Sequence, residues 1–346
     1  MKRLLMLLLV LALLIMPVSA MEFTAPSAPS DVQELMPAET ESFAEGLWYV
    51  VKSSVAKYAP DLTAAALSCL ALVAAVLLAS LLNAMPGSSK RVNHFVCTLA
   101  ICTILLGQAN SLVNLCAKTV NEISEYGKLL LPTMTAALAA EGGTTSATAL
   151  YAGTAIFDTV LCTVISKLLV PMVYVFMALA AANGATGEEI LKKIRDFAKW
   201  LMTWSLKTIL YIFTGYMSIT GVITGTADAA AVKAAKLTIS GVVPVVGGIL
   251  SDASETVILG AGVMKNAVGV YGLLAILAIC VTPFLQIGVQ YLLLKWTAVL
   301  CSVFGVKTAS DLIEDFSSAM GILLGMVGTV SFLMLVSMIC FMKGMG

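Results

Sequence analysis

Long apolar stretches separated by short polar segments run along almost the whole chain. An α-helix rises about 1.5 Å per residue, so about 20 apolar residues cross a hydrocarbon core about 30 Å thick. Stretches of that length predict an all-α, polytopic membrane protein with about six transmembrane helices. They cover residues 62–85, 94–117, 147–182, 201–224, 270–294 and 319–342.

Two other apolar stretches are interrupted by helix-breaking residues. Residues 129–140 are too few to cross a membrane and contain Pro132. Residues 239–269 are dense in glycine and contain Pro244. Proline and glycine free backbone groups that a membrane tolerates only where protein or water satisfies them. Both stretches are therefore predicted to be re-entrant or broken helices.

Ionisable side chains inside apolar stretches, together with the helix-breaking residues, are the first candidates for a functional site. An ionised group at membrane depth costs about 2.5 kcal/mol or more, so it persists where it pairs or meets water. The candidates for a pathway or gate are Pro132, Asp158, Lys167, Pro244, Gly247, Gly248, Asp252, Glu255 and Lys265. Asp252 and Glu255 would share one face of a helix, where they could share a proton or bind a cation. The alternative is that both cap helices at the membrane interface.

The second apolar stretch also carries uncharged polar side chains in its later half. They are Gln108, Asn110, Ser111 and Asn114. Such groups need partners inside a helix bundle or in water. Two interpretations remain open, namely structural hydrogen bonding and the lining of a pathway.

Residues 186–200 have the clearest local pattern in the chain. Thr186 and Glu189 have the spacing of a capping box, and the residues that follow predict an amphipathic helix. Its basic residues are Lys192, Lys193, Arg195 and Lys199. A helix of this kind is expected on the anionic cytosolic membrane surface or as a dock for a soluble partner.

The last apolar stretch contains Gly321 and Gly325, which have the GxxxG spacing. Small residues at this spacing let two membrane helices approach closely. We therefore expect these glycines to lie in a helix-packing face.

The N-terminal region divides into two segments ahead of the helical domain. Residues 1–20 have the basic start, apolar run and small-residue end of a secretory signal peptide, with an uncleaved anchor helix as the alternative. Residues 21–60 are acidic and contain several prolines, so we expect a flexible extracytosolic arm. Residues 61–346 form the predicted transmembrane domain, and basic loops place both ends of the mature chain outside the cytosol.

Composition agrees with a membrane protein and argues against a catalyst. The chain is 60% hydrophobic and 12% charged, against about 25% charged in soluble domains, and its net charge is zero. It has one histidine and none of the common nucleotide-binding or hydrolase motifs. Its eight cysteines include no Cys-x-x-Cys pair. We expect no enzyme activity, cofactor, metal site or nucleic-acid partner.

Two halves of the chain share an order of elements. In each, a broken segment is followed by a proline-containing span, a polar amphipathic helix and a further span. Duplicated halves with discontinuous helices are a common plan among transporters. An internal duplication is therefore one interpretation of this order.

The segment 239–269, with its core VVPVVGGILSDASETV and the following KNAVG, resembles the stage III sporulation protein AE family of endospore-forming Firmicutes. The EEILKK helix and the glycine-rich last span are also similar to that family. The resemblance implies a component of the channel or secretion complex between mother cell and forespore. It further implies a place in the mother-cell membrane around the forespore. The implied partners are other stage III membrane proteins, including an ATPase and ring-forming proteins.

The expected role is therefore a conduit or gate within that complex, needed for forespore development. Two alternatives remain open. One is a membrane scaffold that assembles the partners and conducts nothing. The other is an independent ion-coupled transporter, which would act without partners.

Overall fold

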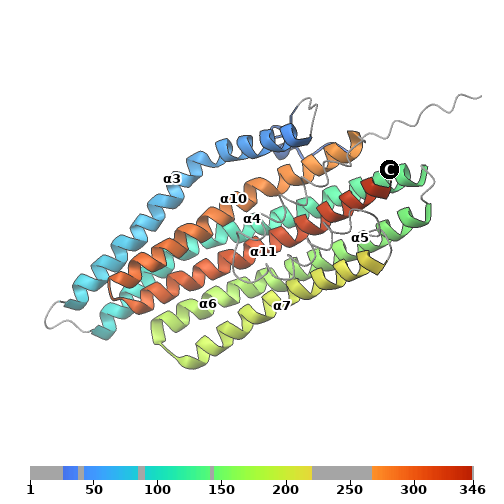
Figure 1. Cartoon of the computed structure of the whole chain (residues 1–346). Helices are drawn as coiled ribbons and strands as arrows, with labels where there is room; N and C mark the ends of the chain where they lie inside the picture. The colour runs from blue at the N-terminus through green and yellow to red at the C-terminus, as the bar shows by residue number, and fades with distance from the viewer. Residues whose placement is uncertain (1–25, 38–42, 85–89, 141–143, 220–266, 345–346) are drawn as a thin grey trace, which may run out of the picture.

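The computed structural model describes residues 26–37, 43–84, 90–140, 144–219 and 267–344, and every regular element in these ranges is a helix. The N-terminal part contains α2 (Ser30–Gln33), α3 (Phe43–Ala84) and α4 (Lys90–Ala140). Next comes one helical rod made of α5 (Thr144–Val164), the π-helical η1 (Ile165–Leu169) and α6 (Val170–Thr186). The last three helices are α7 (Glu189–Ile219), α10 (Ala267–Val303) and α11 (Lys307–Gly344) (Figure 1).

Five helices in the described residues are long and apolar enough to cross a membrane. They are Phe43–Leu82, Phe95–Ala139, Ala147–Thr186, Gly269–Val303 and Lys307–Lys343. The predicted span 201–224 falls on α7, which is described to Ile219 and is not among the five. The all-α, multi-pass class predicted from the sequence is confirmed.

The helices are much longer than a membrane is thick. At about 1.5 Å per residue, the 51 residues of α4 extend over about 76 Å and the 38 residues of α11 over about 57 Å. A hydrocarbon core measures about 30 Å. Roughly half of each of these helices therefore continues beyond the hydrocarbon core, which the apolar stretches alone did not indicate.

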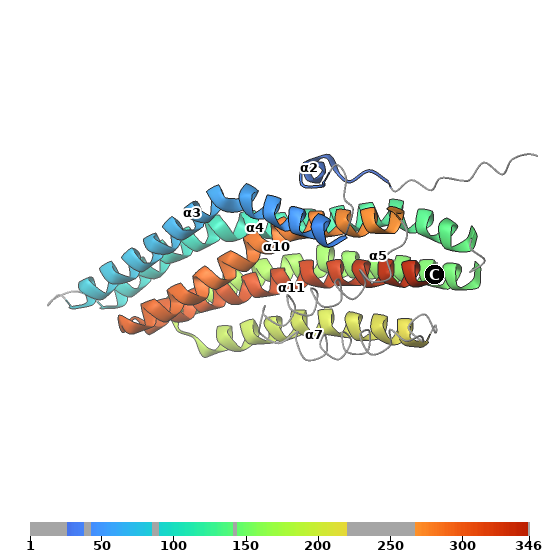
Figure 2. The same ribbon diagram turned by 45° about the horizontal axis from the view of Figure 1, so that its top comes forward.

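The centre of the bundle is the pair α10 and α11, which pack along each other over most of their lengths. In α11 the most apolar window is 72% buried inside the protein, against 22% in α3. The helix α3 covers α10, α4 lies against α11, and α7 packs against α5, α6 and α11 (Figures 1 and 2). The interior helices are held by protein contacts, while the apolar outer side of α3 remains free for lipid.

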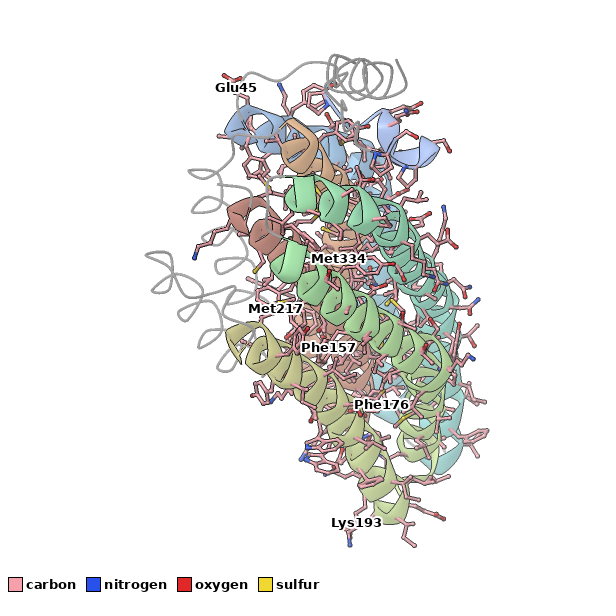
Figure 3. All side chains as sticks on the ribbon, turned by 90° about the vertical axis from the view of Figure 1, so that its right-hand side faces the viewer. Glu45, Phe157, Phe176, Lys193, Met217 and Met334 are labelled. Atoms are coloured by element: carbon pink, nitrogen blue, oxygen red, sulfur yellow. The ribbon has the colours of Figure 1, made fainter. Side chains whose placement is uncertain are left out.

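The contact between α5 and α7 is aromatic. The ring of Phe157 lies 5.4 Å from that of Phe213 and 5.7 Å from that of Tyr216, measured between centroids. Figure 3 shows Phe157 and Met217 near the line where these two helices face each other. Aromatic pairs at this distance add to the apolar area that they bury. The C-terminal half of α7 is therefore held against the bundle through its buried side.

The prediction of a broken helix at residues 129–140 is wrong. The helix α4 runs without interruption through Pro132, whose side chain is exposed. Proline removes one backbone hydrogen bond, but the neighbouring Leu130 and Met134 are fully buried and hold the helix in place. The order of elements proposed for the duplicated halves therefore loses its first broken segment. The second, residues 239–266, lies outside the described residues.

The span predicted at residues 147–182 is one helical rod with a local distortion. The π-helical turn η1 comes directly before Pro171, which has no N–H to donate to the carbonyl of Lys167. A wider turn relieves the contact between the proline ring and that carbonyl. The distortion thus lies beside a proline within the predicted span.

The part of the acidic arm that the structure describes is packed on the bundle. Val32 and Leu35 are buried, and the backbone N–H of Ala28 donates to the Tyr271 hydroxyl at 3.4 Å. The Tyr126 hydroxyl donates to the Pro26 carbonyl at 3.3 Å. Residues 26–37 are therefore not a free arm. The helix α3 begins at Phe43, so the boundary predicted after residue 60 falls inside it, while the signal segment 1–20 lies outside the described residues.

Three helix connections lie at one end of the bundle (Figure 1). Gly187 joins α6 to α7 with φ of 74°, and Gly305 joins α10 to α11 with φ of 76°. Glycine adopts this left-handed conformation without the steric cost that other residues meet. The helix α4 starts at Lys90 at the same end. The basic segments that predict the cytosolic side are thus gathered at one end, as an alternating topology requires.

Candidate functional site: a polar pocket between α3, α4 and α10

A pocket with a volume of about 270 Å³ lies between α3, α4 and α10. Its polar lining consists of Tyr58, Asp61 and Ser68 from α3, Gln108 and Ser111 from α4, and Gln286 and Gln290 from α10. The pocket opens to the molecular surface, where Asp61 and Ser111 are exposed. All three helices are candidates for membrane spans, so a polar pocket between them is a departure from their apolar surroundings.

Side-chain amides connect the three helices across this pocket. The Gln290 Nε2 donates to Gln108 Oε1 at 2.7 Å, and the Gln286 Nε2 donates to Asp61 Oδ2 at 3.4 Å. Gln290 is buried, with 4% of its surface exposed. A buried amide without a partner would be costly, so the bond to Gln108 satisfies one donor that the bundle removes from bulk water. The polar lining thus ties α10 to both of its neighbours.

Two of the three lining helices contain a proline next to the pocket. Pro60 precedes Asp61 in α3, and Pro283 lies one turn before Gln286 in α10. Each proline lacks the N–H that would complete the helical ladder, and its ring bends the helix. Figure 1 shows α3 changing direction near its middle. The pocket therefore lies beside positions where the backbone ladders of α3 and α10 are incomplete.

Polar residues continue from the pocket along the exposed side of α4. This stripe, called here the α4 stripe, consists of the adjacent Asn110 and Ser111, followed at steps of three or four residues by Asn114, Lys118 and Asn121, and all five are exposed. Ser111 belongs to both the stripe and the pocket. The Tyr174 hydroxyl donates to Asn110 Oδ1 at 2.9 Å, and the Ser166 hydroxyl donates to Asn121 Oδ1 at 3.5 Å. The stripe therefore runs beside α6 and η1 as a polar continuation of the pocket.

Asp158, a predicted pathway residue, lies elsewhere in the bundle. Its carboxylate accepts a hydrogen bond from the Ser124 hydroxyl at 2.7 Å and lies 3.6 Å from the Cys162 sulfur. Only 3% of its surface is exposed. Ser124 is 13 residues after Ser111 on α4 (124 − 111), which is roughly 20 Å along the helix. Asp158 is therefore a separate buried site between α4 and α5, and Lys167 of η1 is exposed.

The basic residues predicted to form one surface on α7 separate into two groups. Lys192, Lys193 and Lys199 are exposed, and Lys193 extends away from the end of the bundle (Figure 3). Arg195 faces α11, where its guanidinium pairs with Asp315, and it also pairs with its neighbour Asp196 at 2.9 Å. Only 9% of the Arg195 side chain is exposed. This arginine connects two helices and is not part of the exposed surface.

The outward side of the same helix is aromatic. The ring of Trp200 stacks between those of Phe197 and Trp204, with centroid distances of 5.8 and 6.0 Å. All three side chains are more than half exposed. Tryptophan and lysine together are typical of helices at a membrane surface. This arrangement agrees with both predicted roles of the helix, which are binding to the membrane surface and docking of a soluble partner.

The two glycines of α11 face different neighbours. A Cβ at Gly321 would lie 3.2 Å from Cε2 of Tyr291 on α10, while the nearest atom to a Cβ at Gly325 is Cδ1 of Leu206 on α7, at 3.8 Å. Gly321 therefore permits a close approach of α10. A Cβ at Gly325 would be in ordinary van der Waals contact with its neighbour.

The remaining pathway candidates lie outside the described residues. They are Pro244, Gly247, Gly248, Asp252, Glu255 and Lys265. Sequence reasoning missed Asp61, Gln286 and Gln290, although the two glutamines stand four apart in an apolar stretch and so share a helix face. Among the described residues no group of three or more His, Cys, Asp or Glu side chains could hold a metal ion.

Comparison with known proteins assigns the chain to a family. The family model of stage III sporulation protein AE matches residues 39–346. Stage III sporulation protein AE of Bacillus subtilis (strain 168) is 22% identical over 243 residues, which cover 69% of this chain and 61% of that relative. The alignment thus spans less than two thirds of the relative's length. No solved structure matches the chain. Because the family match extends over nearly all of its described helices, the chain belongs to the stage III sporulation protein AE family.

Proposed function

We propose that this protein is a membrane component of the transport complex between mother cell and forespore, and that its polar pocket is part of a conduit or gate. The observation that carries the proposal is the pocket itself, where polar side chains from three candidate membrane spans converge. Its partners are other stage III sporulation membrane proteins, including an ATPase and ring-forming proteins. Its place is the mother-cell membrane around the forespore, with the mature N-terminus outside the cytosol.

The arrangement of the pocket suits a gate. Two amide hydrogen bonds join the helices across the open pocket, and each such bond contributes about 1 kcal/mol net. Both Pro60 and Pro283 lie at its edge, where α3 and α10 lack part of their backbone ladder. A small change in bend at either proline would break these bonds at low cost. The α4 stripe would then offer polar contacts beyond the pocket.

A scaffold that conducts nothing is the second candidate function. It is favoured by the centre of the bundle, where α10 and α11 pack along each other and bury many apolar side chains. A scaffold would tolerate changes in the pocket that preserve folding. An independent ion-coupled transporter would instead move solute without any partner.

The decisive experiment changes the pocket without removing a helix. Gln290→Leu and Asp61→Asn are introduced in sporulating cells, and heat-resistant spores and a late forespore reporter are counted. We expect both to fall while the protein level in the membrane stays unchanged. Glu45→Gln, at an exposed position on the same helix as Asp61, is the matched control and should sporulate normally.

Normal sporulation of both pocket variants would favour the scaffold. Uptake assays with purified protein in liposomes test the third candidate function. Solute uptake without partners would identify an independent transporter. Uptake that requires the partner ATPase and ring proteins would support the conduit.

A further inference from the structure

We infer that, on the side formed by α3, α4 and α10, lipid acyl chains cover only the half of the bundle that lies toward the Gly187 and Gly305 connections. The other half of these helices stands in water beyond the bilayer. The surface assigned to lipid, called here the lipid belt, consists of the exposed apolar side chains within residues 62–82, 92–106 and 292–303. The inference concerns where the protein meets lipid and does not depend on the proposed function.

The helix α3 divides into a charged part and an uncharged part. Residues 43–61 carry four charged side chains, all of them exposed, namely Glu45, Lys52, Lys57 and Asp61. Residues 62–84 carry none. These 23 residues (84 − 61) extend over about 34 Å, which is enough to cross a hydrocarbon core of about 30 Å. Figure 3 shows Glu45 at the end of the molecule opposite to Lys193, so the charged part points away from the helix connections.

The uncharged part of α3 is also strongly exposed. The side chains of Leu67, Leu70 and Leu81 are 65%, 63% and 65% exposed. On α10 the exposed large apolar side chains in the described residues all lie near its end, between Leu292 and Val303. Exposed apolar surface of this extent marks a contact with protein or membrane. Acyl chains suit it because the same residues form candidate membrane spans.

The helix α4 shows the same division in the opposite chain direction. Residues 92–117 contain no Asp, Glu, Lys or Arg, and Phe95 and Leu99 are exposed among them. The residues after this stretch include Lys118, which is 60% exposed and pairs with Glu122 at 3.2 Å. Glu125 and Lys128 are exposed farther along. Charges that face acyl chains are costly, so this part of α4 faces water.

The register of α11 against α4 indicates what lies beyond the bilayer. The Cys116 sulfur donates to the Leu323 carbonyl at 3.6 Å, and Gly127 faces the side chain of Met334. Residues 323–334 of α11 therefore lie level with the charged outer side of α4. They belong to the span that the sequence predicts at 319–342, yet the most apolar window of α11 is 72% buried inside the protein. Burial in a protein core accounts for their apolar character without a bilayer.

The side of the bundle formed by α5 and α7 has no such division. Ile156 on α5 and Ile212 on α7 are 61% and 57% exposed, and both lie well beyond the connection at Gly187. The boundary is therefore assigned on α3, α4 and α10 only, where exposed charge and exposed apolar surface separate along the helix.

Two tryptophans of similar exposure test this boundary. Trp48 on the charged part of α3 is 69% exposed, and Trp296 on the lipid belt is 72% exposed. Each of two variants keeps one of these tryptophans and has phenylalanine in place of the other three in the chain. The full-length variants are placed in nanodiscs of phosphatidylcholine with plain or brominated acyl chains, and tryptophan fluorescence is compared.

Bromine quenches fluorescence only at short range, so it reports contact with acyl chains. We expect the fluorescence of Trp296 to fall about twofold or more, because the hydrocarbon core reaches it. That of Trp48 should not change, because Trp48 lies 14 residues before Leu62 (62 − 48), about 21 Å along the helix. Equal quenching of the two tryptophans, or no quenching of Trp296, would overturn the inference.

A second pair of variants leaves the tryptophans in place. Val55→Lys and Leu78→Lys each put a lysine at an exposed apolar position of α3, where the native side chains are 50% and 61% exposed. We expect Val55→Lys to reach the wild-type level in the membrane fraction. The level of Leu78→Lys should fall several fold, because its charge would lie among acyl chains. Equal levels of the two variants would contradict the proposed boundary.

Discussion

The side-chain amide of Gln290 on α10 donates a 2.7 Å hydrogen bond to the side-chain oxygen of Gln108 on α4, across a distance of 182 residues in the chain. The bond links the interior helix of the bundle to one of its outer helices at the edge of the polar pocket. Substitution of Gln290 by leucine removes the donor and leaves an acceptor in a partly buried place. We expect a loss of about 1–2 kcal/mol in the free energy of unfolding.

Denaturant unfolding in detergent measures this loss. The same change at Gln33, which is exposed on α2, is the control and should alter stability by less than about 0.5 kcal/mol. Equal losses in the free energy of unfolding of both variants would mean that the hydrogen bond across the pocket does not stabilise the protein.

Arg195 should matter more for stability than any of the lysines on α7. Its guanidinium pairs with Asp315 on α11, and the two side chains are 9% and 16% exposed. Arg195→Ala leaves the aspartate without its partner, and breaking a buried pair in this way costs about 3–5 kcal/mol. Lys193→Ala, at an exposed position on the same helix, should cost less than about 0.5 kcal/mol.

A double-mutant cycle identifies the source of the Arg195 effect. If the pair is the cause, Arg195→Ala combined with Asp315→Ala should be less destabilised than the sum of the two single variants. Additive losses would mean that the arginine acts through packing of its aliphatic part and not through its charge.

Glycine substitutions should differ widely in cost along these helices. A Cβ at Gly153 would overlap the ring of Tyr216, and that ring is held by a 2.8 Å hydrogen bond from its hydroxyl to the Ala149 carbonyl. Gly153→Ala should therefore destabilise the protein by about 1–3 kcal/mol. At Gly107 no atom lies within 4 Å of the added Cβ, so Gly107→Ala should stabilise the helix by up to about 1 kcal/mol. Thermal unfolding of the two variants in the same detergent tests the order.

We expect the hydrogen bond between Ser124 and Asp158 to stabilise the fold. Ser124→Ala removes the 2.7 Å hydrogen bond to a carboxylate that is 3% exposed, and we expect a loss of about 1–3 kcal/mol. Asp158→Asn keeps an acceptor oxygen for the serine and should be milder. A milder effect of Ser124→Ala than of Asp158→Asn, measured by chemical unfolding, would contradict this assignment.

Part of the candidate site is visible in the sequence. Gln108 and Ser111 stand out because they are polar within an apolar stretch, and both line the pocket. Gln286 and Gln290 carry the same signal, because they are a pair of amides four residues apart in an apolar stretch. Asp61 was not identified because it stands at the start of its apolar stretch, where a charge is ordinary. Which of these groups meet depends on the packing of three helices and cannot be read from any one of them.

The sequence by itself determined the class of the protein and the apolar cores of its long helices, but not their ends. Apolar runs long enough to cross a membrane leave the backbone no arrangement but a helix, because the hydrocarbon core offers it no hydrogen-bond partners. Local chemistry likewise predicted the amphipathic helix α7, but the capping box proposed for it is wrong, because Thr186 is the last residue of α6 and α7 begins at Glu189. These features depend on neighbours in sequence, so they are legible there.

Only the tertiary structure decided how the prolines, charges and polar side chains within the helices are accommodated. The helix α4 continues through Pro132 because buried neighbours on both sides hold it, and Arg195 turns inward because α11 presents Asp315 to it. The pocket exists because two bent helices and a third bring Asp61, Gln108 and Gln290 together. Each of these outcomes is set by contacts between residues far apart in the chain, whose free energies outweigh local preference.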